Sequence, residues 1–232
     1  MSAGSAVAAN LLAVRARMAA ACERSGRRPD SVALLAVSKT HPSIAVREAY
    51  SAGQRAFGEN RVQELLQKAD QLVDLPGLRW HMIGSLQTNK VRDLLRVPGF
   101  ALLHSLDRTR LADELQRELL RAGRRLEALL EVHATDEPTK HGCALAEVPA
   151  LLDHVQANCP DVTVLGLMAM GPAAGDPASV FDRVASLREA LRSRSGLPLS
   201  TLSLGMSGDL EAAIAAGSTL VRVGTAVFGA RG

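Results

Sequence analysis

Lys39 is placed in the sequence where a fold could present a reactive amine. It directly follows the apolar run 32–38, so a buried strand would bring it to a strand end. A lysine at the mouth of an apolar core is less hydrated than one in water. This favours the neutral amine, which can form a Schiff base with an aldehyde. Most lysines after a strand are only solvated end residues, so Lys39 alone does not identify a site.

Two small turns near the end of the sequence are suited to bind an anion. Ser207 lies in the glycine-flanked turn 204–209, and Gly224 with Thr225 follows the strand predicted over 220–223. Backbone N–H groups and hydroxyls in such turns can donate to phosphate, and in parallel barrels the last two turns frequently do so. Each turn alone is also explained by chain reversal, with Ser207 as a helix cap.

Arg222 has the same parity as Gly224 on the last predicted strand, so both face the same side of the sheet. An arginine directed into a barrel requires a partner, which is usually a carboxylate but can be the ring nitrogen of a bound pyridine. A phosphate turn, this arginine and Lys39 together describe a site for pyridoxal 5'-phosphate. A Schiff-base aldolase acting on a sugar phosphate would use the same lysine and turns, and it stays an alternative.

Three histidines offer a competing metal site. His81, His104 and His133 fall on the third, fourth and fifth predicted strands, and three inward imidazoles can hold zinc. The sequence has no His-x-His pair, and lone histidines on strands are mostly hydrogen-bonded core residues. We therefore predict that no metal is bound.

Short apolar strand segments alternate along the chain with longer helical segments. The chain has 232 residues, 47% of them hydrophobic, which suffices for a large core. Helical crossovers imply parallel pairing, and about eight strands at this length are typical of a barrel. We predict one α/β domain over residues 1–232, a (β/α)8 barrel of the TIM type with an additional N-terminal helix over 5–24. The predicted strands are 32–38, 56–59, 80–83, 101–106, 127–134, 162–170, 201–204 and 220–223.

The leading helix has one apolar stripe. Val7, Leu11, Val14, Met18 and Cys22 recur at helical spacing. We expect this stripe to cover the barrel beside its last strand. An open doubly wound sheet is the competing fold, but no G-x-G-x-x-G follows the first strand.

The composition argues against several functional classes. A net charge of +3 comes from scattered basic residues, and an aromatic content of 3% leaves few surfaces on which bases could stack, so we expect no nucleic acid. No apolar run approaches membrane-spanning length. Cys22, Cys143 and Cys159 are odd in number and lack C-x-x-C spacing, which predicts unpaired thiols and a cytoplasmic location.

Several long motifs, in order along the chain, resemble the pyridoxal phosphate homeostasis protein family. They are 34–40, 57–64, 80–90, 166–170, 202–209 and 224–229. The resemblance covers nearly the whole chain from Val32 onward. It implies a barrel similar to the N-terminal domain of bacterial alanine racemase, with pyridoxal phosphate held as a Schiff base on Lys39. By motif position it also implies phosphate binding by Ser207, Gly224 and Thr225, a contact from Arg222 to the pyridine nitrogen, and a pocket lined by Asn60, His81 and Met168.

The resemblance implies a carrier that buffers the cofactor and delivers it to apo-enzymes. A racemase-like enzyme dependent on pyridoxal phosphate is the alternative. It needs a second base, which related racemases take from a tyrosine on an additional β domain, and the only tyrosine here, Tyr50, falls on a predicted outer helix. An arginine at the ring nitrogen also weakens the ring as an electron sink. We predict a non-catalytic monomer whose partners are the cofactor and, transiently, apo-enzymes. Departures from the family pattern at His133, Pro138 and His141 leave the contacts of the loop after the fifth strand open.

Overall fold

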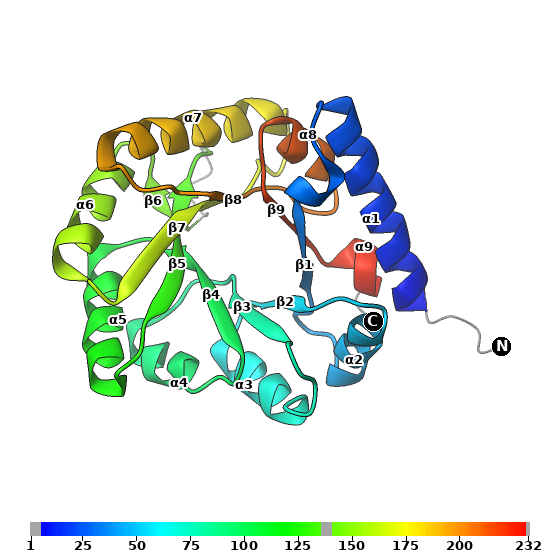
Figure 1. Cartoon of the computed structure of the whole chain (residues 1–232), viewed down its shortest axis with the longest axis horizontal. Helices are drawn as coiled ribbons and strands as arrows, with labels where there is room; N and C mark the ends of the chain where they lie inside the picture. The colour runs from blue at the N-terminus through cyan, green and yellow to red at the C-terminus, as the bar shows by residue number, and fades with distance from the viewer. Residues whose placement is uncertain (1–5, 136–140, 231–232) are drawn as a thin grey trace.

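Parallel strands close into a barrel in the computed structural model of the protein (Figure 1). The structure describes residues 6–135 and 141–230. Neighbouring strands follow the order β4-β3-β2-β1-β9-β8-β7-β5, and pairing of β5 with β4 joins the ends of the sheet. The predicted barrel is confirmed, and the open sheet is excluded because it would keep two unpaired edges. The barrel strands are β1 (Ala33–Val37), β2 (Ala56–Glu59), β3 (Arg79–Met82), β4 (Phe100–Leu106), β5 (Leu126–His133), β7 (Val162–Ala169), β8 (Thr201–Ser203) and β9 (Leu220–Val223).

Helices form a ring around the barrel (Figure 1). Each turns an apolar face inward; in α5, for example, Leu111, Leu115 and Leu119 recur at helical spacing and are buried. The helices are α1 (Ala6–Arg24), α2 (Ser43–Ser51), α3 (Val62–Gln71), α4 (Val91–Leu95), α5 (Thr109–Ala122), α6 (Val148–Asn158), α7 (Pro177–Ser195), α8 (Leu210–Ala215) and α9 (Thr225–Phe228), with 3-10 turns η1 (Pro29–Ser31) and η2 (Thr88–Lys90).

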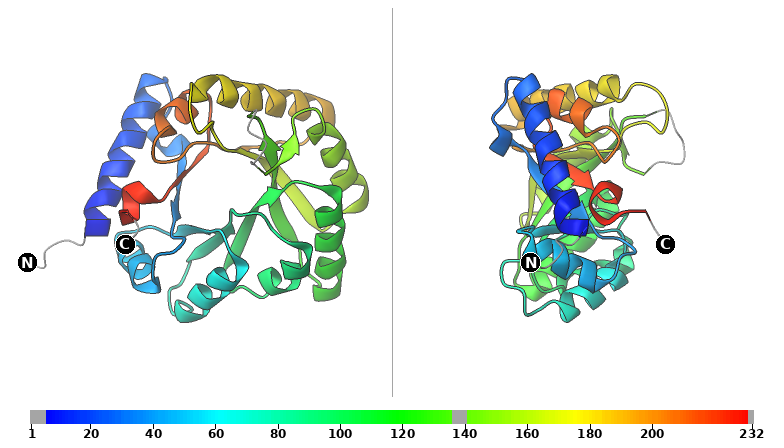
Figure 2. Two further views of the ribbon diagram at one scale, coloured as in Figure 1. Left: turned by 180° about the vertical axis from the view of Figure 1, so that it is seen from behind. Right: turned by 90° about the vertical axis from the view of Figure 1, so that its right-hand side faces the viewer.

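The helix α1 covers the barrel next to its last strand, as its apolar stripe predicts. Figure 2 shows it lying beside α8 and α9, and it packs against both. The Asn10 side chain donates to the carbonyl oxygen of Val227 at 3.0 Å, and Arg17 pairs with Glu211. The N-terminal segment thereby closes the outer ring where the last strand leaves a gap.

Two short elements were not predicted from the periodicity of the sequence. The strand β6 (Cys143–Ala144) extends the sheet beside the end of β5, and α9 follows β9 at once. Both are too short to show an apolar repeat. Together they shape the rim of the barrel where the carboxyl ends of the strands lie.

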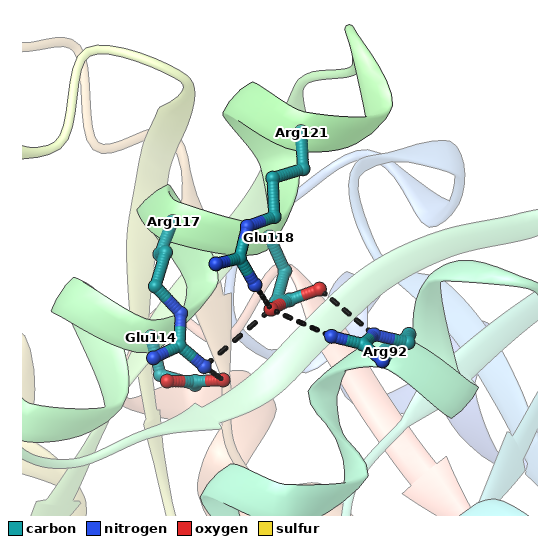
Figure 3. A network of polar contacts seen from close by, with 5 residues as sticks. All are labelled: Arg92, Glu114, Arg117, Glu118 and Arg121. Carbon is teal, nitrogen blue, oxygen red and sulfur yellow. Dashed lines mark hydrogen bonds and ion pairs between the residues drawn. The ribbon is translucent and has the colours of Figure 1, made fainter.

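An ionic network joins α4 to α5 on the outer surface (Figure 3). The Glu118 carboxylate accepts from Arg121 at 2.6 Å and from Arg92 at 3.1 Å. The hydrogen bond from Arg92 holds the pKa of Glu118 below its ordinary value. The arginines are largely exposed, although the Glu118 carboxylate that they cover is buried. Pairs with one solvated partner add little stability, so the network chiefly fixes how the two helices sit together.

Neither membrane spans nor disulfides were expected from the sequence. None of the helices in the described ranges combines the length and hydropathy required to cross a bilayer. The three cysteines are buried and unpaired, as their spacing predicts.

The strands β7 and β8 approach most closely at Gly166. A Cβ at this position would lie 1.7 Å from the carbonyl oxygen of Thr201, so no side chain fits there. The register of β7 against β5 also shifts just before Gly166, between Ala128 and Leu129 of β5. A glycine is therefore required where β7 bends past its neighbour.

Replacing Gly166 by alanine should separate β7 from β8 and lower the free energy of unfolding by about 3 kcal/mol. Urea denaturation followed by far-UV circular dichroism measures the loss. The matched control is Gly26→Ala, whose added Cβ meets nothing within 4 Å and whose φ of +64° costs only about 1 kcal/mol. Equal losses in the two variants would contradict close strand approach as the cause.

Candidate functional site

A cavity of about 320 Å³ opens at the carboxyl ends of the strands. It gathers side chains that are far apart in the sequence, since every parallel strand ends on the same rim. Seven of the eight predicted site residues line it: Lys39, Asn60, Met168, Ser207, Arg222, Gly224 and Thr225. The eighth, His81, is not among the lining residues.

Lys39 follows β1 after one buried residue, Ser38, and is itself half-buried at the cavity. The chain turns here, because the His41 N–H donates to the Ser38 carbonyl oxygen at 3.0 Å. Thr40 completes this turn with a φ of +67°, a left-handed conformation that costs a residue with a Cβ about 1–2 kcal/mol. The Glu64 carboxylate accepts from the Thr40 N–H at 2.6 Å and offsets part of that cost.

A buried ion cluster lies beneath this turn. The Lys68 ammonium donates to the Ser38 carbonyl, to Glu59 and to Glu64, each at 2.7 Å. The Ser38 hydroxyl donates to Glu59 at 2.6 Å. Burial raises the pKa of Glu59 to about 7, against the opposing effect of Lys68. We call Ser38, Glu59, Glu64 and Lys68 the Lys68 cluster; sequence reasoning missed it, although Glu64 and Lys68 have the spacing of a helical ion pair.

The turns after β8 and β9 form a cradle of donors. Ser207 is not the cap of α8, because Asp209 takes that position and accepts from the Met206 N–H at 2.6 Å. In the described part of the chain, the N–H groups of Ser207 and Thr225 donate to no protein acceptor. These groups and two hydroxyls are therefore available to an anion.

Gly224 lets the backbone of the cradle lie close to β1. A Cβ there would stand 3.1 Å from the Val37 carbonyl oxygen, tighter than ordinary contact. Gly224 and Arg222 both line the cavity, as their shared parity predicts. The turn after β9 is thereby held against the strand that carries Lys39.

Arg222 is buried, and within the described part of the chain its hydrogen bonds go to neutral oxygens and not to a carboxylate. Its guanidinium donates to the carbonyl and hydroxyl oxygens of Ser203 at 2.7 and 2.8 Å, and to the Ala169 carbonyl at 2.9 Å. Burial lowers the pKa of Arg222 to about 10, so the group stays charged at neutral pH. The fork is thus fixed in place by neutral oxygens, while Asp209 and Glu131 act on its charge from a distance, and it brings a positive charge to the cavity.

His81 lies against His104 and not at the cavity. Nδ1 of His81 is 2.9 Å from Nε2 of His104, whose Nδ1 is 3.3 Å from the Ser203 hydroxyl. Burial lowers the pKa of His81 to about 3 and that of His104 well below its ordinary value, so both are neutral. His81 on β3 and His104 on β4 thereby connect these strands to Ser203, which accepts from Arg222.

The histidines that sequence spacing offered to zinc do not converge with His133. Within the described ranges, the one group of three ligand-type side chains is Asp113, His154 and Cys159 between α5 and α6. Its Asp113–His154 pair, at 2.6 Å, is explained as a contact between the two helices. The buried Nε2 of His133 has no hydrogen-bond partner among residues 6–135 and 141–230, and Pro138 lies outside these described ranges.

Four apolar lining residues were not predicted. Val37, Ile83, Met170 and Met206 complete the cavity wall. Met170 directly follows the end of β7 and has the parity of Met168 on that strand, so alternation could have found it. Met206 lies at the rim of the cavity and is 41% exposed.

Asn60 stands between this cavity and a neighbouring one of about 410 Å³ that includes His141. Its buried Oδ1 has no hydrogen-bond partner in the described chain and is available to accept from a ligand. The donor set fits a phosphorylated pyridine aldehyde: hydroxyls and amides for the phosphate, methionines for the ring faces, and an amine for the carbonyl.

Comparison with known proteins identifies the family. Residues 9–232 match the family model described as alanine racemase, N-terminal domain. The protein is 45% identical over 227 residues to the pyridoxal phosphate homeostasis protein of Pseudomonas aeruginosa, covering 98% of this chain and 96% of the relative. The Escherichia coli (strain K12) protein of that name is 44% identical over 229 residues, with 97% of each chain covered. The chain belongs to the pyridoxal phosphate homeostasis protein family.

Solved structures agree with this membership. PipY of Synechococcus elongatus, with pyridoxal phosphate bound, superposes with a TM-score of 0.84 at 37% identity, covering 96% of this chain and 100% of PipY. Alanine racemase from Corynebacterium glutamicum gives a TM-score of 0.71 at 16% identity, covering 98% of this chain and 62% of the racemase. At this identity the racemase shows the fold alone, and it confirms the predicted racemase-like barrel. The family resemblance is confirmed by the family model and by the relatives.

Glu131 adds a buried carboxyl group to the barrel of this family member. It is in register with Met168, so its side chain faces the same side of the sheet. Its Oε2 has no hydrogen-bond partner in the part of the chain described. Burial, helped by the negative charge of Asp107, raises its pKa to about 7 even though Arg222 and Arg108 oppose the shift.

The raised pKa makes stability depend on pH in a defined direction. The folded protein holds the Glu131 proton more tightly than the unfolded chain, so the stabilisation is complete below pH 4.5 and is lost as pH rises through 7. Between pH 5 and pH 8 wild type should therefore lose about 2 kcal/mol relative to Glu131→Gln.

Urea denaturation of both proteins at the two pH values measures this difference, and comparison within each pH removes the similar contribution of Glu59. A constant difference between the proteins would contradict the raised pKa of Glu131.

Proposed function

We propose that the protein binds pyridoxal 5'-phosphate as a Schiff base on Lys39, buffers the cofactor and delivers it to apo-enzymes. The observation that carries the proposal is the meeting of Lys39, the cradle at Ser207 and Thr225, and Arg222 around one cavity. The names of its relatives and the cofactor bound in PipY support it.

Each lining residue has a role that its chemistry supports. Lys39 supplies the amine that condenses with the aldehyde, with loss of one water. Ser207, Gly224 and Thr225 bind the phosphate through hydroxyl and backbone donors. Arg222 directs its charge to the pyridine nitrogen, and Asn60 and Met168 border the ring.

Holding the cofactor is favoured over catalysis on it. Among the described residues that line the cavity, Lys39 carries the only amine, imidazole or carboxyl group, whereas racemisation requires one base on each face. Tyr50 is on α2, where its hydroxyl donates to the Pro76 carbonyl at 2.8 Å and Arg55 stacks on its ring. A permanently charged Arg222 also disfavours a protonated ring.

The remaining partner assignments follow from this role. The three methionines on the wall suit an aromatic ring better than the hydroxyls of a sugar phosphate, which disfavours the aldolase. Three unpaired cysteines support a reducing cytoplasm as the location. We propose a monomer with transient contacts to apo-enzymes.

Purified protein mixed with pyridoxal 5'-phosphate should develop a visible absorbance band, and borohydride should fix the cofactor to Lys39. Peptide mass mapping after reduction locates the modified residue. Lys39→Ala should lose the fixed cofactor, whereas Lys90→Ala, a lysine away from this cavity, should keep it. Fixation at another lysine, or no band at all, would refute the assignment.

The protein loaded with cofactor should not racemise alanine above background, because no second base lines the cavity. Enzymes commonly turn over at about 10 s⁻¹, so exchange of the α-hydrogen in D₂O followed by NMR detects far slower rates. Turnover near that value, abolished by Lys39→Ala, would favour the racemase-like alternative.

A further inference from the structure

The residues on both sides of Lys39 are fixed by side chains from α3. The Lys68 ammonium donates to the Ser38 carbonyl at 2.7 Å, and Glu64 accepts from the Thr40 N–H at 2.6 Å. Lys68 and Glu64 are themselves paired at 2.7 Å. The ion pair of Lys68 and Glu64 therefore holds the backbone at the residue before Lys39 and at the residue after it.

Glu59 also binds Lys68 and so stabilises this arrangement. Its carboxylate receives both Lys68 and the Ser38 hydroxyl, and the Lys68 and Glu59 side chains are only 6% and 0% exposed. Burying such charges is costly, and buried ion pairs seldom stabilise a fold more than apolar residues of the same size would. The general stability of the barrel is therefore a poor explanation for the Lys68 cluster.

The turn that carries Lys39 is strained, which points to a positional role. It runs from Ser38 to His41, and Thr40 occupies the third position with a φ of +67°. Glycine normally takes this position, and a β-branched residue there is an outlier. Such strain persists only where the surroundings determine the backbone, and it is typical of functional sites.

Lys68 cannot itself compete with Lys39 for an aldehyde. Its nitrogen donates to three oxygens, so it carries three protons and has no free electron pair. It also does not line the cavity. Lys68 thus holds the turn, and Lys39 faces the cavity.

We propose that Lys68, Glu64 and Glu59 are positioning residues that aim Lys39 into the cavity and thereby determine how long the cofactor is retained. The inference rests on the proposed function, because retention has meaning only if the cofactor binds at Lys39. Loosening the turn would let the Lys39 side chain leave its fixed direction, so the bond to the cofactor would be more open to water and to competing amines.

The test loads wild type and variants with pyridoxal 5'-phosphate and adds excess semicarbazide, which captures the aldehyde. Glu64→Gln and the charge-balanced pair Lys68→Met with Glu59→Gln should release the cofactor about fivefold faster or more. The circular dichroism of the visible band, which reports a fixed asymmetric orientation, should weaken in the same variants. Asp70→Asn makes the same change as Glu64→Gln at an exposed position of α3 and should behave as wild type.

Thermal unfolding measured in parallel separates positioning from general destabilisation. Lys68→Met alone leaves Glu59 buried without a cation and can fail to fold, whereas Glu64→Gln leaves Lys68 paired with Glu59 and keeps the fold testable. Release rates and visible dichroism equal to wild type in Glu64→Gln and in the double variant would overturn the inference while leaving cofactor binding intact. If wild type itself takes up no cofactor, the proposed function fails, and this inference fails with it.

Discussion

Closure of the sheet between β4 and β5 is the constraint on which the site depends. It brings the carboxyl ends of all the barrel strands to one rim, so residues separated by most of the chain become neighbours. Lys39 after β1 meets Ser207 after β8 and Thr225 after β9 at a single cavity. An open sheet would have left β4 and β5 as unpaired edges and exposed their inward residues. The helix α1 completes the arrangement from outside, because it packs over the turns that follow β8 and β9.

Two cations reach the interior by different means. Lys68 pairs with the carboxylates of Glu59 and Glu64 and donates its third hydrogen bond to the turn after β1. Arg222 is met by neutral oxygens on β7 and β8, and it keeps its charge for the cavity. The first arrangement fixes geometry, and the second supplies an electrostatic field to whatever binds there. A site for an anionic, ring-shaped ligand needs both.

The sequence predicted the barrel and most of the candidate site because these depend on local signals. The alternation of strands and helices has a clear period, and Lys39, Ser207 and Gly224 follow strand ends directly. The Lys68 cluster was missed because Lys68 looks like an ordinary helical lysine until α3 is packed against β1 and β2. Motif position assigned His81 to the pocket, but in the structure its ring lies against His104. The elements β6 and α9 were missed because segments this short contain no repeat of apolar residues.

The contact between Arg222 and Ser203 fixes the direction of a longer chain of hydrogen bonds. An arginine can only donate, so the Ser203 oxygen accepts and its own proton is assigned to Nδ1 of His104. His104 then carries its hydrogen on Nε2 and donates to Nδ1 of His81, which in turn carries its hydrogen on Nε2. With this assignment each ring presents its electron-rich nitrogen towards the guanidinium. Two aligned imidazole dipoles thus replace part of the water that Arg222 loses on burial, and they add to the long-range attraction of Asp209 and Glu131, neither of which pairs with it directly.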